Sequence, residues 1–233
     1  MNIVTWNMQG ATGFRESKWV TDIPRLFSAG AEILCLQECG LLPPRAVNLA
    51  APAWLAGPGA VNTRFAQINY GTRSRPAYVN VLWAETDPVG HRVNLAVAYL
   101  PTSVAAINSV LLANPAGGGS RPALGLRFPA GGGTVVIYTV HAVSPGGADA
   151  PGLVGAIVAT GNPFFVAGDF NRNPATWAGL VPAGANPCPN NAAVTHPGSG
   201  TNLDYAFSSG GPFNGTVLGS FIVSDHLPVG YVT

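Results

Sequence analysis

The stretch Phe164-Phe165-Val166-Ala167-Gly168-Asp169-Phe170-Asn171 joins an apolar strand pattern to two polar side chains. Gly168 is expected to let the backbone turn at the end of the strand, and residues two apart in an extended chain point to the same side. Asp169 and Asn171 are therefore predicted to face one site. A carboxylate and an amide placed together can orient a water molecule on a phosphorus atom. The competing explanation is an Asx turn that caps a following helix.

The same pattern, an apolar run that ends on a polar residue, recurs along the chain. Only 9% of the residues are Asp, Glu, Lys or Arg, so each acidic residue at such a place is informative. Surface solvation alone would not place carboxylates, amides and imidazoles at strand ends. The other residues of this kind are Asn7, Glu38, His141, Asp204, Asp225 and His226.

These residue types suit the hydrolysis of phosphate esters. A divalent cation prefers hard oxygen ligands, which Glu38 can supply at the end of residues 33–36, and the attacking water needs a base. His226 directly follows Asp225. A carboxylate near the imidazole would fix its tautomer and raise its basicity, as a general base or a phosphate donor requires.

Each residue also has a structural explanation when it is taken alone. Asn7 can be a turn former at a strand end, His141 a structural imidazole, and Asp204 a turn carboxylate. His91 and His196 have no comparable setting, and both are interpreted as loop residues.

Strand patterns outnumber helical patterns, and several strands are apolar on both faces. Two packed β-sheets with helices on the outside account for this. No composition shift, charge block or linker divides the chain, so a single domain over residues 1–233 is expected. The predicted strands cover residues 2–7, 33–36, 77–83, 92–99, 123–128, 134–140, 164–167, 203–207 and 227–232. The predicted helices cover residues 17–29 and 149–160, with a short turn at 174–180.

The charge of the chain is nearly balanced. A net charge of +1 argues against a protein that holds nucleic acid chiefly through a general basic surface. Six of the ten arginines nonetheless fall between Arg64 and Arg127, and guanidinium groups bind phosphates in a bidentate manner. An ordinary surface position, with no role in binding, explains each of these arginines equally well. No stretch reaches the roughly 18 unbroken apolar residues of a membrane span, so a water-soluble protein is expected.

The cysteines and the N-terminus bear on the cellular compartment. Three cysteines are an odd number, which argues against a disulfide framework. Cys188 is interpreted as a loop thiol that is either unpaired or bonded to another chain. The N-terminus has no basic head followed by an apolar stretch and a cleavage site. Either the protein is not secreted by that route or the signal is absent from this sequence.

Taken in order, the polar motifs resemble those of the endonuclease/exonuclease/phosphatase superfamily, which includes deoxyribonuclease I. The motifs are Trp6-Asn7-Met8-Gln9-Gly10, Leu36-Gln37-Glu38, Val140-His141-Ala142, Gly168-Asp169-Phe170-Asn171, Leu203-Asp204-Tyr205 and Ser224-Asp225-His226-Leu227-Pro228-Val229. Residues 90–97, 120–127, 141–143, 146–151 and 168–174 are also similar to the corresponding stretches of the active subunit in the cytolethal distending toxin family.

The resemblance implies an α/β fold: a four-layer, DNase I-like sandwich of two packed, mostly antiparallel β-sheets with helices on the outer faces. It implies a site for Mg²⁺, or for Mn²⁺ or Ca²⁺ in its place, formed by Glu38, Asn7 and Asp225. The catalytic residues that it implies are His141, Asp169, Asn171, Asp204 and His226, and the phosphate-holding residues are Arg92 and Arg127.

The same resemblance assigns roles within this set. Asp169 and Asn171 would position the attacking water and the scissile phosphate, and Asp204 would support His226. His141 would donate a hydrogen bond to the phosphate or protonate the leaving oxygen. Whether Asp169 or His226 takes the proton of the water stays open, and Asp149 receives no role.

The expected function is therefore magnesium-dependent nicking of DNA by the active subunit of a genotoxin. The resemblance implies secretion, toxin delivery subunits as partners and action inside a target cell. One alternative keeps the same residues and changes the substrate to a phosphoinositide or another phosphomonoester. A second alternative, from a different class of function, is a binding subunit that kept the fold and lost turnover.

Overall fold

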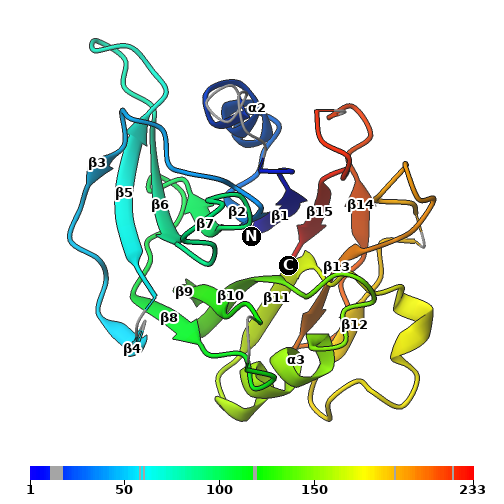
Figure 1. The fold of residues 1–233 in the computed structure, drawn as a ribbon. Coiled ribbons are helices and arrows are strands. Elements are labelled where there is room, and N and C mark those ends of the chain that lie inside the picture. Colours follow the sequence, from blue (N-terminus) through cyan, green and yellow to red (C-terminus); the bar gives the residue numbers. More distant parts are fainter. Residues whose placement is uncertain (11–17, 58, 60, 118–119, 192, 222) are drawn as a thin grey trace.

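The computed structural model describes residues 1–10, 18–57, 59, 61–117, 120–191, 193–221 and 223–233, which form two β-sheets packed face to face (Figure 1). Across the first sheet the strands are β14 (Gly215–Val217), β15 (Val229–Val232), β1 (Asn2–Asn7), β2 (Ile33–Gln37), β7 (Leu95–Tyr99), β6 (Tyr78–Ala84), β5 (Thr63–Asn69) and β3 (Val47–Asn48). Across the second sheet they are β12 (Asn186–Cys188), β13 (Asp204–Ser208), β11 (Phe164–Asp169), β10 (Gly133–His141), β9 (Ala123–Ala130), β8 (Asn108–Leu112) and β4 (Trp54–Ala56).

A helical layer covers the outer face of each sheet. The helical segments are the π-helical turn η1 (Lys18–Asp22), α2 (Ile23–Ser28), α3 (Ala150–Ala159) and the 3₁₀ turn η2 (Pro174–Trp177). One apolar cluster fills the space between the sheets, a second lies between the first sheet and α2, and a third lies between the second sheet and α3. The predicted four-layer sandwich of mostly antiparallel sheets is confirmed.

Two parallel strand pairs set the position of the polar motifs. β1 pairs with β2, and β10 pairs with β11, each in parallel. A parallel pair needs a crossover connection, which α3 supplies between β10 and β11. The carboxyl ends of all four strands therefore meet at one edge of the sandwich. Asn7, His141 and Asp169 are the last residues of their strands, and Glu38 directly follows β2.

Gly168 is required by close approach and does not provide the turn that the sequence pattern predicted. It lies inside β11, opposite Val140 of β10. A Cβ atom at residue 168 would lie 2.0 Å from the carbonyl oxygen of Val140, which is far inside van der Waals contact. Glycine at this position therefore lets the two strands pair directly below Asp169.

The first predicted helix differs in detail from the observed one. Ser17, its first predicted residue, lies outside the described residues, and the segment that follows begins as a π-helical turn before α2. Pro24 lies in the first turn of α2, where its missing N–H costs no hydrogen bond. Six strands were not predicted: the seven-residue β5, the five-residue β8, and the shorter β3, β4, β12 and β14. No described helix is long and apolar enough to cross a membrane.

The interpretation of Cys188 as a loop thiol that could bond another chain is not supported. Cys188 ends β12, pairs with Ala206 of β13 and is only 1% exposed. Its side chain belongs to the apolar cluster between the sheets. All three cysteines are free and buried, so none is available for an intermolecular disulfide in this fold.

Candidate functional site

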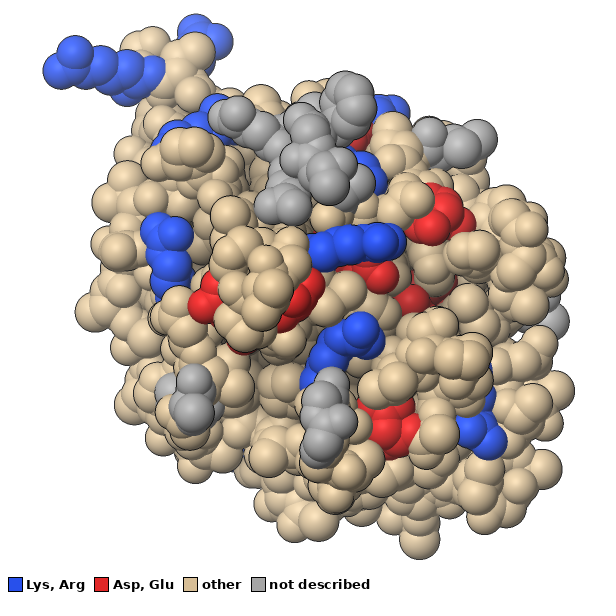
Figure 2. Space-filling view, in the orientation of Figure 1, with Lys and Arg blue, Asp and Glu red and all other residues tan. Residues whose placement is uncertain are grey.

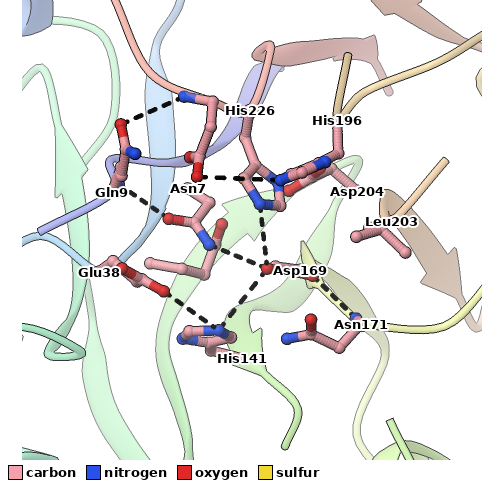
Figure 3. A network of polar contacts seen from close by, with 12 residues as sticks. Asn7, Gln9, Glu38, His141, Asp169, Asn171, His196, Leu203, Asp204 and His226 are labelled. Carbon is pink, nitrogen blue, oxygen red and sulfur yellow. Dashed lines mark hydrogen bonds and ion pairs between the residues drawn. The ribbon is translucent and has the colours of Figure 1, made fainter. Parts of the chain in front are cut away.

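The polar motif residues converge at the edge of the sandwich where β1, β2, β10 and β11 end and β13 begins (Figure 3). The strand register explains part of this, because Asp169 pairs with His141 on one side and with Asp204 on the other. The first sheet contributes Asn7 and Glu38, and the second contributes the other three strand-end residues. The site is thus a seam between the two sheets.

Asp169 is the centre of the network. Its carboxylate is 1% exposed, and its Oδ2 accepts a hydrogen bond from Asn7 Nδ2 at 2.9 Å. The same Oδ2 lies 3.6 Å from His141 Nε2 and 3.7 Å from His226 Nε2. Its Oδ1 accepts the backbone N–H of Asn171 at 2.8 Å. Burial and the nearby Asp204 carboxylate raise the pKa of Asp169 above its usual range.

His226 is held by a fully buried carboxylate. Its Nδ1 lies 2.7 Å from Oδ2 of Asp204, which is 0% exposed. Burial lowers the pKa of His226, but the hydrogen bond and negative charge of Asp204, together with the charges of Asp169 and Asp225, outweigh burial and raise it to about 9. The backbone carbonyl of His226 accepts a hydrogen bond from Trp6 Nε1 at 3.3 Å.

His141 has the opposite electrostatic setting. Burial lowers its pKa well below the usual value, and the positive charges of Arg121, His226 and Arg92 act in the same direction. Its Nδ1 has no hydrogen-bond partner in the described part of the chain. The neutral ring can therefore carry its proton on Nε2, the atom that faces Asp169.

Glu38 lies on the opposite side of the same space. Its Oε1 is 3.8 Å from His141 Nε2, while its Oε2 accepts a hydrogen bond from Arg92 Nε at 3.1 Å. The side chain is 14% exposed. Its backbone φ of +46° is unusual for a residue with a side chain, and Asn171 has a φ of +48°. Both residues therefore hold a sparsely populated conformation that turns the chain sharply at a strand end.

Asn7, Asn171 and Asp225 lie around this core. Asn7 Oδ1 accepts the backbone N–H of Gln9 at 2.9 Å, which orients the amide toward Asp169. Asn171 Nδ2 donates to the carbonyl of Ala142 at 2.9 Å. Asp225 is more open than the others: its side chain is 39% exposed, and its Oδ2 lies 3.8 Å from His196 Nε2.

A buried polar bridge joins the two sheets directly below the site. Gln37 of β2 donates through Nε2 to Thr139 Oγ1 of β10 at 2.7 Å and to the carbonyl of Cys35 at 3.0 Å. Gln37 and Thr139 are both 0% exposed. Because buried polar groups are costly when unpaired, these bonds fix how β2 and β10 lie against each other.

Arg127 is not brought to the site. It lies four residues before the turn of the β9–β10 hairpin, pairs with Val136, and donates through Nη2 to Asn162 Oδ1. Val136 is five residues from His141 along β10, or roughly 16 Å at the rise of a strand. A residue at the other end of β9, Arg121, lies beside the site and donates through Nη1 to the carbonyls of His141 and Ala142 at 3.3 and 3.0 Å.

Two residues of the site were missed as candidates by sequence reasoning. Arg121 was counted only in the arginine-bearing stretch, although an antiparallel hairpin brings the residues before its first strand next to the end of its second. His196 was interpreted as a loop residue, yet its ring meets that of His226 with 4.7 Å between centroids. No local pattern around His196 indicates this contact, which depends on how two distant loops pack. Asp149 is structural, since it accepts Asn114 Nδ2 and the backbone N–H of Val143, both at 2.8 Å.

Oxygen donors that suit a divalent cation lie in this region of the fold. Glu38 Oε1, the Asn7 amide and the Asp225 carboxylate are oxygen donors of the kind that Mg²⁺ prefers. Within the described residues, Glu38 Oε1 has no hydrogen-bond donor, so one carboxylate oxygen remains for a ligand in the site. Lys18 is close enough for the charges of Asp225 and Glu38 to act on its pKa, which burial lowers. The amino group of Lys18 thus lies near the carboxylates of Glu38 and Asp225.

Comparisons with known proteins identify the family of the chain and its fold. Residues 4–226 match the Endonuclease/Exonuclease/phosphatase family. The chain is 33% identical to a cytolethal distending toxin component of Escherichia coli over 253 residues, which cover 98% of this chain and 90% of the relative. It is similar to a chain in the crystal structure of the Haemophilus ducreyi cytolethal distending toxin, with a TM-score of 0.86, 32% identity and coverage of 99% and 97%.

A further similar structure is that of CdtB, described as the biologically active subunit of cytolethal distending toxin. It has a TM-score of 0.83 and 29% identity, with coverage of 99% of this chain and 96% of the other. A structure of humanized D. rerio TDP2, at 14% identity and a TM-score of 0.65 over 99% of this chain, shares the fold alone.

The matched family is one of hydrolases of the nuclease and phosphatase type, and its members generally depend on a divalent metal. The order of the motifs, the layered sandwich and the toxin relatives together show that this chain belongs to the endonuclease/exonuclease/phosphatase family.

Proposed function

We propose that the protein is a magnesium-dependent endonuclease that hydrolyses phosphodiester bonds of DNA. The observation that carries the proposal is the buried Asp169 carboxylate, which lies between two imidazoles and is hydrogen bonded to Asn7 from the opposite sheet. A carboxylate with a raised pKa is suited to accept a proton near neutral pH. The histidines on either side can hold a phosphate group against it.

The two histidines have different roles because they differ in charge. The raised pKa of His226 keeps this ring protonated at neutral pH, so it stabilises negative charge on the phosphate and does not act as the base. His141 stays neutral and donates its Nε2–H to a phosphate oxygen. Asp169 then accepts the proton of the attacking water, which Asn171 helps to orient, while the P–O bond to the leaving oxygen breaks and that oxygen takes up a proton from solvent. Arg92 and Arg121 hold flanking phosphates.

The metal site completes this proposal. Glu38 would hold a magnesium ion, with Asn7 and Asp225 beside it. The ion would withdraw negative charge from the phosphate in the transition state. Removal of divalent cations with a chelator is therefore expected to abolish turnover while the fold persists.

Nicking of supercoiled plasmid DNA tests the proposal. Glu38→Gln and Asp169→Asn are expected to lower the nicking rate by roughly 10² to 10⁴, as loss of a metal ligand or a base does in other enzymes. Glu32→Gln is the matched control, because Glu32 precedes β2 at the end opposite to Glu38 and bonds the backbone N–H of Asn2. Undiminished nicking by Asp169→Asn in the presence of Mg²⁺ would refute the mechanism.

The toxin relatives extend the proposal to a biological role. We infer that the chain is the active subunit of a cytolethal distending toxin-like protein, secreted, delivered by partner subunits and active inside a target cell. If the protein neither nicks plasmid DNA nor releases phosphate from phosphoinositides, it is a binding subunit that kept the fold and lost turnover.

A second candidate is phosphatase activity on a phosphoinositide or another phosphomonoester. It is favoured by the low basic charge of the molecule: the face shown in Figure 2 is mostly uncharged, and its few basic side chains alternate with acidic ones near the middle. A small anionic substrate needs few basic contacts, whereas duplex DNA usually draws on many. Phosphate release from phosphoinositide vesicles, measured beside plasmid nicking in the same buffer, separates the two candidates.

A further inference from the structure

His196 lies at the edge of the site, beside two of its charged residues. Its Nε2 is 3.8 Å from Asp225 Oδ2, and its ring lies edge-on to the ring of His226 at an interplanar angle of 75° (Figure 3). The side chain is 23% exposed, so a ligand in the site can reach it.

The backbone next to His196 is tied to the same residues that build the site. Thr195 is 0% exposed, and its Oγ1 accepts the backbone N–H groups of Leu203 and Asp204 at 2.9 and 3.0 Å. Its carbonyl accepts the backbone N–H of Leu227, the residue after His226, at 2.7 Å. His196 therefore has a defined position relative to the Asp204–His226 pair.

A turn within the loop fixes the tautomer of His196. The backbone N–H of Ser199 donates to Nδ1 of the ring at 3.1 Å, and the hydroxyl of Ser199 lies 2.7 Å from the same nitrogen. A backbone amide can only donate, so Nδ1 must offer a lone pair. The single ring proton of the neutral imidazole is then on Nε2.

This tautomer distinguishes between two roles for His196, as a metal ligand or as a hydrogen-bond donor. His196, Asp225 and His226 have the residue types of a metal site, with one donor atom from each within 4.8 Å of the others. A histidine that ligates a metal through Nε2 donates its Nδ1–H to an acceptor. His196 shows the reverse arrangement, because its Nδ1 accepts and its Nε2 carries the proton. The ring is therefore a hydrogen-bond donor and not a metal ligand.

We propose that His196 is a substrate-contacting residue whose Nε2–H donates a hydrogen bond to a non-bridging oxygen of a phosphate group bound beside Asp225 and His226. The proposal rests on the proposed phosphoester substrate of the site. At 3.8 Å, Nε2 is too far from Asp225 to form a hydrogen bond with it, and it bonds no other residue that the structure describes, so the donor is available to a ligand.

Kinetics of DNA cleavage test this contact. His196→Ala is expected to lower kcat/KM about tenfold, mostly through a higher KM, because a hydrogen bond to a charged group contributes on the order of 1.5 kcal/mol and equal binding of substrate and transition state acts on KM. His196→Gln keeps an N–H donor and is expected to recover most of this loss. His91→Ala is the matched control, since His91 pairs with Glu85 outside the site. A His196→Ala variant within twofold of wild type, or a glutamine variant as defective as the alanine one, overturns the proposal.

Nitrogen-15 NMR of the imidazoles gives a readout that does not depend on turnover. Long-range ¹⁵N–¹H correlations are expected to show His196 with its proton on Nε2, and titration with inorganic phosphate is expected to shift this nitrogen in wild-type protein. If wild-type protein cleaves neither DNA nor phosphoinositides, the proposed function fails, and the phosphate titration alone decides the role of His196. A proton on Nδ1, or no shift with phosphate, overturns the proposal.

Discussion

His141 and His226 differ in charge although both rings lie in the same small site. Burial keeps His141 neutral, whereas Asp204 outweighs burial at His226 and keeps that ring protonated. Both rings lie within 3.7 Å of the same Asp169 oxygen. One neutral donor and one cation therefore face a single carboxylate, which gives the site a polarity that two equivalent histidines could not provide.

The pKa of His226 gives a prediction at the residue scale. In metal-free protein with EDTA, NMR titration of the His226 ring is expected to have its midpoint near pH 9, and Asp204→Asn is expected to lower that midpoint by at least one unit. Because the folded pKa exceeds the unfolded value of about 6.5, protonation favours the folded state. This contribution to stability is complete below about pH 6.5 and is lost as the pH rises through about 9.

Urea unfolding checks the sign. The advantage in free energy of unfolding of wild type over His226→Gln is expected to shrink between pH 6.5 and 9. A midpoint that is the same in wild type and Asp204→Asn would show that the buried carboxylate does not control the proton on His226.

Residue patterns could indicate which side chains meet, but not how each is oriented. Asn7, His141 and Asp169 end apolar runs, and the parallel pairing of strands brings such ends together. The ring of His196 is placed by Ser199 and Thr195, whose hydrogen bonds depend on loop packing that no periodicity encodes. Arg121, and not Arg127, lies beside the site because of the direction in which the β9–β10 hairpin runs. The strand patterns in the sequence were sufficient to predict this.

At the scale of secondary structure elements, the close pairing of β10 and β11 depends on Gly168. Gly168→Ala is expected to destabilise the protein by several kcal/mol, because its Cβ would lie 2.0 Å from the Val140 carbonyl oxygen and the strands would have to separate. Gly155→Ala in α3 is the matched control. Its Cβ would be 3.9 Å from Pro182, and alanine is expected to stabilise the helix by about 0.5–1 kcal/mol.

Thermal or urea unfolding of the two variants measures the difference. Equal stability of Gly168→Ala and wild type would mean that the strands can separate at no cost. The shortest strands missed by sequence reasoning, β3 with two residues and β4 with three, contain no glycine on which close strand pairing depends. They are too short for a period-2 pattern to be visible, and they form because longer neighbours present free edges.

At the scale of the whole molecule, the low charge predicts weak dependence of DNA binding on salt. With two phosphate-holding arginines, Arg92 and Arg121, the logarithm of the association constant is expected to fall with the logarithm of salt concentration with a slope of about −2. Arg121→Ala should make the slope shallower by about one unit. Arg127→Ala should leave it unchanged, because that side chain bonds Asn162 away from the site.

Fluorescence anisotropy with a labelled duplex in EDTA, which prevents cleavage, provides the measurement. A steeper slope in wild type would reveal further basic contacts, and a change caused by Arg127→Ala would place the duplex on a different face. A slope near zero together with plasmid nicking would point to recognition of the phosphate by the metal site alone.

The hydrogen bond between Asn7 and Asp169 spans the seam between the two sheets, so one layer cannot slide past the other without separating amide from carboxylate. A molecule that bridges this seam would act as a clamp on the entire sandwich. Tight-binding inhibitors should therefore be recognisable by resistance of the protein to heat and to proteolysis, far from the place where they sit.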